Sequence, residues 1–369
     1  MTRSESNITS LLSRCIAAGD FPSAVYLVAE NNRIMFSDAL GQAVRDPGRP
    51  ASLDTIYDLA SLTKPLITGL LCARLIELGE LTLDSAVANY LGEFERTDRH
   101  GITVRQLLVH TSGLPAWRPL YITSGGEPDA ALGAIAAETL ESPPGTRVIY
   151  SDLNFIALGF LLERLTGMKL GNLAHTEIFT PLGLQRTFFN PAAAMQTEVA
   201  ACETGNSYER QMCERTLPDR PYEGWRSNLI WGEVHDGNAH FLGGVAGHAG
   251  LFSTAGDTLR LANQFLARQT ELLSPETCEL FRTNMTEGLN EARSPGWHLA
   301  TKQSSAGPDL PPDAFGHTGF TGTSCWIDPN YDRVFLLLTN RTHVPTLPFA
   351  DIKSVRQQFH SLAVAALNG

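Results

Sequence analysis

A serine and a lysine three residues apart, Ser61 and Lys64, form the pattern with the clearest potential for chemistry in this chain of 369 residues. They open a stretch that reads as a helix from Ser61 to about Gly79. Residues i and i+3 lie on one face of a helix, so the hydroxyl and the amine would be side by side. A serine hydroxyl is a weak nucleophile unless a base activates it. The spacing therefore predicts a nucleophile beside a group that can handle its proton.

The start of this helix is also suited to a nucleophile. At a helix N-terminus, free backbone N–H groups and the helix dipole favour developing negative charge. Pro65 supports a start at this point, because proline is tolerated in the first turn of a helix. The alternative is a capping serine followed by a surface lysine, since the S-x-x-K pattern is common by chance. The pattern alone leaves both interpretations open.

Composition narrows the classes of function. The chain is 43% hydrophobic and 18% charged, which is typical of a globular protein. A formal net charge of -11 without a basic block argues against nucleic-acid binding. No apolar run approaches the ~18 residues needed to span a membrane. The first ten residues lack a signal-peptide pattern, which predicts a cytoplasmic protein, or a periplasmic or secreted one if a leader has been removed.

The cysteines are scattered and include no C-x-x-C pair. Neither a zinc site nor a disulfide framework is expected, and most should be small buried hydrophobes. A disulfide between Cys202 and Cys213 is the alternative. The six are Cys15, Cys72, Cys202, Cys213, Cys278 and Cys325.

Strand patterns lie near both chain ends and helical patterns lie between them. Two hairpins are expected, at 23–30 with 33–39 and at 324–328 with 333–339. Helices are expected near the ends at 8–18 and 350–367, and between the hairpins at 104–110, 129–140, 154–166, 170–179 and 254–267. This order predicts an α+β fold in which both ends build one antiparallel sheet flanked by helices.

We expect one catalytic unit over residues 1–369. Its α/β subdomain would comprise 1–75 and 241–369, and a mostly helical subdomain, 76–240, would be inserted between them. The stretch near 191–240 has no clear period and is predicted to be a long loop. Loops of this length in compact proteins are usually functional or disordered.

Two further motifs support the catalytic interpretation of Ser61 and Lys64. They are Tyr-Ser-Asp at 150–152 and His-Thr-Gly at 317–319. With them the chain resembles the penicillin-recognising serine hydrolases, in particular the class C β-lactamase and DD-carboxypeptidase-like branch. That branch carries S-x-x-K, Y-S/A-N and K/H-T-G in this order. The resemblance extends from about Ser23 to Thr339 and includes further stretches at 102–115, 143–167, 181–184 and 250–257.

The resemblance implies a β-lactamase/transpeptidase-like fold and catalysis through an acyl-enzyme. Ser61 would attack an acyl carbon, while Lys64 and Tyr150 would share the proton transfers. A tyrosine is a useful base only where nearby positive charge favours its phenolate form, and Lys64 can supply that charge.

The same resemblance assigns the binding groups. The backbone N–H groups of Ser61 and Phe320 would stabilise the oxyanion. The strand that carries Thr318 and Gly319 would bind the substrate backbone or carboxylate.

Two residues depart from the usual β-lactamase pattern. Asp152 stands where the family usually has Asn, and a carboxylate there would keep Lys64 protonated and repel an anionic substrate. His317 stands where β-lactamases usually have Lys, and a largely neutral histidine weakens a fixed cationic site. Both changes favour an esterase or peptidase over a β-lactamase.

The segment 231–248 contains His235, Asp236, His240 and His248. Histidine and aspartate are metal ligands, but their spacing here matches no ligand signature, so no metal is expected. The resemblance places the segment beside the cleft. His235 and Asp236 would then contact substrate, or alternatively order the loop.

His110 and Ser112 invite a Ser-His-Asp interpretation. The chain has no G-x-S-x-G elbow, and the turn at 111–113 is better explained as the end of a helix.

The sequence therefore predicts a serine hydrolase that needs neither a metal nor an organic cofactor. Its substrates would be small esters or amides such as D-amino-acid peptides, with weak β-lactam hydrolysis at most. The rival is a catalytically idle, penicillin-binding-like sensor that is acylated without turnover. Nothing in the sequence indicates an oligomeric state.

Overall fold

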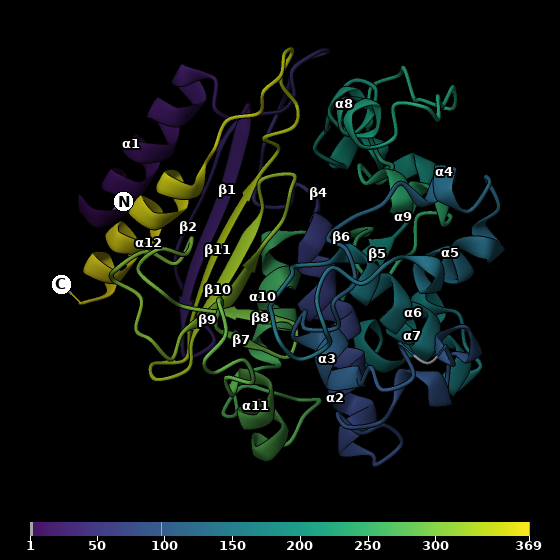
Figure 1. Ribbon diagram of the computed structural model, residues 1–369. Coiled ribbons are helices and arrows are strands. Elements are labelled where there is room, and N and C mark those ends of the chain that lie inside the picture. The colour runs from purple at the N-terminus through teal and green to yellow at the C-terminus, as the bar shows by residue number, and fades with distance from the viewer. Residues whose placement is uncertain (1–2, 97, 369) are drawn as a thin grey trace.

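An eight-stranded antiparallel sheet separates two terminal helices from a large helical region in the computed structural model, which describes residues 3–96 and 98–368 (Figure 1). The strand order is β3-β2-β1-β11-β10-β9-β8-β7. The strands are β1 Ser23–Glu30, β2 Arg33–Val44, β3 Arg49–Pro50, β7 Arg293–Ser294, β8 Trp297–Leu299, β9 Phe315–Thr318, β10 Ser324–Asp328 and β11 Arg333–Thr339.

The centre of the sheet joins the two ends of the chain. β1 pairs with β11 in a continuous register from Ala24 opposite Thr339 to Glu30 opposite Arg333. Val25 and Leu27 face the core shared with the helical region, while Tyr26 faces the terminal helices. Both faces of β1 are thus buried, which explains its unbroken apolar sequence. The prediction of an antiparallel sheet built from both ends is confirmed.

Two long helices cover the outer face of the sheet, α1 (Arg3–Ala18) and α12 (Lys353–Asn368), and they lie side by side in Figure 1. Leu12 and Phe359 belong to their common apolar layer with the sheet. On the inner face, α10 (Ala255–Asn263) packs against β1 and β11. The sheet is therefore held from both sides, and the end of β9 can serve as a fixed wall.

The helical region consists of short helices around a continuous apolar core. Its α-helices, with α11 below the sheet, are α2 Leu70–Glu77, α3 Val104–Leu108, α4 Leu120–Thr123, α5 Ala131–Ala137, α6 Asp152–Thr166, α7 Leu170–Ala174, α8 Ser207–Thr216, α9 Gly237–Phe241 and α11 Pro275–Arg282. A small sheet joins β4 Tyr57–Asp58, β6 Leu251–Ser253 and β5 Phe188–Phe189. Within the described residues, no helix has both the length and the apolar character to cross a membrane.

The six cysteines are all buried and free, as the sequence predicts, and Cys202 and Cys213 are not bonded to each other.

The prediction of a long loop near 191–240 is wrong. This stretch contains a 3₁₀ helix, Ala193–Glu198, and two α-helices, α8 and α9. In α8 the buried positions are Glu209 and Cys213, so its inward face carries no apolar repeat that a periodicity argument could detect.

The prediction of a helix from Ser61 to about Gly79 has nearly the right extent, but the segment is not a regular α-helix throughout. It begins with a 3₁₀ turn, Ala60–Leu62, continues as a π-helical stretch, Lys64–Gly69, and becomes α-helical only in α2. Pro65 has no N–H to donate, so a regular ladder of hydrogen bonds does not start there. π-Helical turns of this kind often occur at functional sites.

Candidate active site

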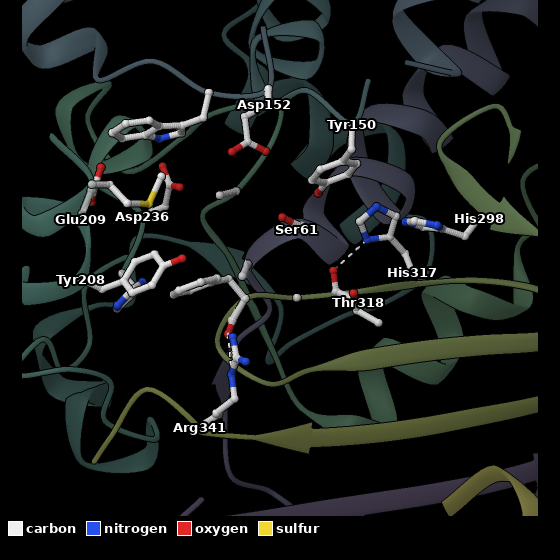
Figure 2. A pocket seen from close by; sticks show the side chains of 18 of the residues that line it. Ser61, Tyr150, Asp152, Tyr208, Glu209, Asp236, His298, His317, Thr318 and Arg341 are labelled. Carbon is white, nitrogen blue, oxygen red and sulfur yellow. Dashed lines mark hydrogen bonds between the residues drawn. The ribbon is translucent and has the colours of Figure 1, made fainter. Parts of the chain in front are cut away.

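One cavity of about 660 Å³ lies between the end of β9 and the helical region. All the predicted site residues except Lys64 line it, and several of them are labelled in Figure 2. Lys64 is fully buried and lies 2.9 Å from Ser61 Oγ. The predicted residues in its lining are Ser61, Tyr150, Asp152, His235, Asp236, His317, Thr318, Gly319 and Phe320. The three motifs, far apart in the chain, therefore meet in one place.

The turn that presents Ser61 is held by a buried carboxylate, Asp58. Ala60 has a positive φ of 48°, a conformation that a non-glycine residue adopts only when its surroundings impose it. Asp58 accepts hydrogen bonds from the backbone N–H of Ala60 and of His235, both at 2.8 Å. Burial raises the pKa of Asp58. Asp58 thus ties the nucleophile turn to the 231–248 segment, a role that no sequence motif revealed.

Lys64 is fully buried and surrounded by polar partners. Its Nζ donates to Ser61 Oγ at 2.9 Å and to the carbonyl oxygen of His248 at 3.2 Å, and it lies 2.7 Å from Asp152 Oδ1. Burial by itself would lower the pKa of Lys64, but the charges of Asp152 and Tyr150 outweigh it and hold that pKa above its ordinary value. Lys64 is therefore an ammonium at neutral pH, and it is the hydrogen-bond donor, not the acceptor, in its contact with Ser61 Oγ.

Tyr150 lies between two cations. The Lys64 Nζ is 4.9 Å from the centre of the Tyr150 ring. The guanidinium carbon of Arg293, which belongs to β7, is 5.2 Å from the same centre. The ring also packs against His110, with centroids 4.7 Å apart. Figure 2 shows the Tyr150 hydroxyl directed toward Ser61. Tyr150 therefore lies beside Ser61 with two positive charges close to its ring.

Arg293 is a cavity residue that sequence reasoning missed. It is 1% exposed, and its Nη2 donates to Glu291 at 2.8 Å, while its Nε and Nη1 are buried without a partner in the described part of the chain. His298 Nδ1 also lies 2.8 Å from Glu291. Burial would raise the pKa of Glu291, but His298 and Arg293 lower it to about 2. Arg293 thus brings a fixed positive charge to the cavity wall.

His317 is neutral. Its Nδ1 lies 2.9 Å from the carbonyl oxygen of Thr318, so Nδ1 carries the proton and Nε2 is an acceptor. That Nε2 is buried and has no partner among the described residues. Burial, and then the charges of His298, Lys64 and Arg293, hold the pKa of His317 well below its ordinary value. His317 therefore brings no fixed positive charge to this motif, in agreement with a largely neutral histidine.

Gly319 allows the end of β9 to approach the nucleophile turn. A Cβ at this position would collide with the Thr323 hydroxyl and with the carbonyl oxygen of Leu59. Two arginines hold the turn that follows. Arg356 Nη2 donates to the Gly319 carbonyl at 3.2 Å, and Arg341 Nη2 donates to the carbonyl of Phe320 at 2.6 Å.

His235 and Asp236 line the cavity and also order its wall. His235 Nε2 lies 3.0 Å from Glu203, and its ring stacks on Phe320 with centroids 5.6 Å apart. Asp236 caps α9 by accepting from the N–H of Ala239 at 2.7 Å, and it lies 2.8 Å from His248 Nε2. Burial would raise the pKa of Asp236, but His248 and these hydrogen bonds hold it well below its usual range.

Asp152, Asp236 and His248 offer possible metal-ligand atoms within 4.8 Å of one another. The Lys64 ammonium, 2.7 Å from Asp152, opposes a second cation at this point. The three residues therefore act as partners of Lys64 and of the loop, and they do not fit a metal site.

His110 and Ser112 do not form a catalytic pair. His110 Nδ1 accepts from the backbone N–H of Ser151 at 3.0 Å, and Ser112 Oγ donates to Asn154 at 2.6 Å. Both residues are buried. Burial, followed by the charges of Arg293 and Lys64, lowers the pKa of His110, so a neutral imidazole supports the Tyr150 ring.

Glu209 of α8 is a second cavity residue without a sequence signal. It is 8% exposed and accepts from the Tyr121 hydroxyl at 3.0 Å and from the backbone N–H of Gly237 at 3.1 Å. Burial and the nearby charge of Asp236 raise the pKa of Glu209 to about 8. A carboxyl group that is partly protonated at neutral pH thus lines the cavity.

Comparison with known proteins agrees with this geometry. The Beta-lactamase family profile matches residues 8–358. A putative D-alanyl-D-alanine carboxypeptidase of Escherichia coli K12 is 32% identical over 358 residues, covering 88% of this chain and 80% of the relative. An N-acetylmuramyl-L-alanine amidase of Bacillus subtilis strain 168 is 32% identical over 378 residues, covering 94% and 83%.

Solved structures show the same fold. EstCE1, a hydrolase with promiscuous acyltransferase activity, superposes with a TM-score of 0.76 at 23% identity, covering 98% of this chain and 99% of its own. A class C β-lactamase superposes with a TM-score of 0.74 at 17% identity, covering 100% and 97%. The predicted α+β, β-lactamase-like fold is thereby confirmed. With a family profile that spans most of its length, this chain belongs to the β-lactamase family of serine hydrolases, which includes the penicillin-binding-protein-like enzymes.

Proposed function

We propose that this protein hydrolyses small esters or amides, peptides included, through an acyl-enzyme on Ser61. The observation that carries the proposal is the buried Lys64 ammonium, which lies 2.9 Å from Ser61 Oγ and 2.7 Å from Asp152. A lysine held in this form cannot accept the serine proton. Tyr150, whose hydroxyl points toward Ser61, is left as the base.

The reaction follows from these positions. The Tyr150 phenolate takes the proton of Ser61, and Oγ bonds to the substrate acyl carbon. The backbone N–H groups of Ser61 and Phe320 stabilise the oxyanion. When the carbon–oxygen or carbon–nitrogen bond breaks, Tyr150 returns the proton to the leaving group. Tyr150 then deprotonates a water molecule, and the water oxygen bonds to the acyl carbon. The bond from that carbon to Ser61 Oγ breaks, the acid is released, and Tyr150 returns the proton to Ser61.

The charges around the cavity support esters and amides over β-lactams. Asp152 places a carboxylate beside the nucleophile, which disfavours an anionic substrate near it. The relatives named carboxypeptidase and amidase favour an amide substrate. The cationic wall at Arg293 suits a leaving group that carries a carboxylate.

Two chromogenic substrates separate the hydrolase from a sensor that is acylated without turnover. We expect continuous release of nitrophenol from a short-chain nitrophenyl ester and little or no turnover of a chromogenic cephalosporin. Mass spectrometry of the quenched reaction should find the acyl group on the peptide that contains Ser61. A burst equal to the enzyme concentration, with no later turnover of either substrate, would instead establish the sensor.

Replacing Asp152 with asparagine should shift the substrate preference. The change removes the carboxylate that repels anions and keeps the size of the side chain, so we expect cephalosporin hydrolysis to improve relative to the neutral ester by about tenfold. The ratio of the two kcat/KM values is the measurement. Asp257→Asn is the control, because this carboxylate accepts from the Arg186 N–H and the Thr187 hydroxyl and is not part of the cavity lining. Equal losses on both substrates would refute this role for Asp152.

A further inference from the structure

The cavity has two walls of opposite character (Figure 2). Tyr150, His298 and His317 lie on one side of Ser61, and Asp236 and Glu209 lie on the other. The base that takes the serine proton also returns it to the leaving group, so the leaving group must lie on the Tyr150 side. The acyl group of the substrate must then extend toward Asp236 and Glu209.

The leaving-group wall contains an arginine that pairs with Glu291 and keeps two donors without a partner. Arg293 is almost fully buried and lines the cavity, and its Nε and Nη1 find no partner among residues 3–96 and 98–368. The unpaired His317 Nε2 lies on the same wall. Buried donors without a partner are costly, and an anionic group of the ligand would satisfy those of Arg293. The wall thus marks a place for a negative group on the leaving part of the substrate.

The acyl wall carries one carboxyl group, Glu209, that has no cation of its own among the described residues. No lysine or arginine in the described ranges forms an ion pair with Glu209, although the group is almost fully buried. The nearest candidate, Arg226, donates to the carbonyls of Val234 and His235. Asp236 has His248 as its ion-pair partner. Because Glu209 lies buried near the Asp236 charge without a cation of its own, an added positive charge would favour its carboxylate form.

The backbone at Gly237 leaves room for the Glu209 carboxyl group and binds it. Its carboxyl group lies against Gly237, where any Cβ would collide with both carboxyl oxygens. Tyr121 and the Gly237 N–H fix its two oxygens. The carboxyl is therefore held in a defined position at the cavity rather than placed there by chance.

Aromatic rings complete this wall. Trp117, Tyr208 and Phe320 line the same cavity, and Tyr208 packs on Phe320 with ring centroids 4.9 Å apart. Aromatic faces attract ammonium groups, and carboxylates bind them through charge-assisted hydrogen bonds. This combination of carboxyl groups and rings is complementary to an organic cation.

We propose that the acyl side of the cavity binds a substrate ammonium, so that the preferred substrates are amides or esters of amino acids with a free amino group. The proposal deepens the proposed function and rests on it. The aminoacyl group would bond to Ser61 Oγ as the bond to the leaving group breaks, and water would then release the free amino acid. With Arg293 on the opposite side, a small peptide with both ends free would match both walls.

The first test compares alanyl p-nitroanilide with N-acetylalanyl p-nitroanilide, in both D and L forms. We expect wild-type kcat/KM to favour the free amine of one enantiomer, and Glu209→Gln to reduce that preference about tenfold or more. The intrinsic reactivities of the two anilides cancel when enzyme variants are compared. Glu214→Gln, on the exposed side of the same helix, is the matched control and should retain the wild-type preference.

The second test needs no variant. Alaninamide and N-acetylalaninamide, again in both forms, are compared as inhibitors of nitrophenyl acetate turnover by the wild-type enzyme. The cationic amide should inhibit at a concentration about tenfold lower. Equal inhibition, or a free-amine preference that Glu209→Gln leaves intact, would overturn the ammonium site. Failure of the proposed function would differ, because ester turnover would be absent or independent of Ser61.

Discussion

Replacing Ser61 with alanine is expected to lower the turnover of every substrate by at least about a thousandfold. The reason is that the substitution removes the only atom that forms the covalent intermediate. Lys64 and Asp152 remain paired at 2.7 Å, so the fold and the charge of the cavity are retained. Initial rates on a nitrophenyl ester measure the loss, and intact-protein mass spectrometry should show no acyl adduct on the variant.

Ser354→Ala is a suitable control for this experiment. Ser354 is exposed on α12 and is not part of the cavity lining, and its loss should leave the rate unchanged. If Ser61→Ala retained the wild-type rate on the ester, another group would be the nucleophile and the acyl-enzyme mechanism would be wrong.

Replacing Tyr150 with phenylalanine is expected to lower kcat by about 10²- to 10⁴-fold, the usual contribution of a general base. The ring is retained, so its packing on His110 and its contacts with Lys64 and Arg293 persist. The expected change therefore lies mainly in kcat, with a small change in KM. Steady-state kinetics on an ester and an amide, together with a thermal unfolding curve, separate lost catalysis from lost stability.

This result distinguishes two possible bases. If Lys64 accepted the serine proton, Tyr150→Phe would reduce the rate only severalfold. Tyr331→Phe, at an exposed tyrosine on the β10–β11 turn, controls for the loss of a phenolic hydroxyl elsewhere and should retain full activity. A variant of Tyr150 that kept near wild-type kcat would contradict the proposed role of the phenolate.

The motif residues and the other cavity residues differ in how well the sequence predicts them. Ser61, Lys64, Tyr150 and the run 317–319 stand in short motifs whose order is diagnostic, and the structure brings them to one cavity. The consequence of Asp152 was also foreseeable, because a carboxylate next to an ammonium acts over a few ångströms. The order of the family's motifs, together with local charge, was sufficient to predict these residues.

Other residues of the cavity could not be found in this way. Arg293 lies on a two-residue strand, and Glu209 lies on a polar helix with no apolar repeat. Asp58 fixes the nucleophile turn through hydrogen bonds that join residues 58 and 235. No local pattern marks these positions, because the other residues of the cavity that they line come from distant parts of the chain.

The sequence by itself predicted the nucleophile with its lysine and tyrosine, and it determined a sheet built from both chain ends. The first prediction depends on the order of three short motifs, and the second on patterns of alternating burial. Only the tertiary structure decided which charges face Ser61 from each side. Burial sets those charges, and burial depends on which distant segments pack together. Arg293 and Glu209 therefore gained their places in the active site when β7 and α8 packed around the cavity.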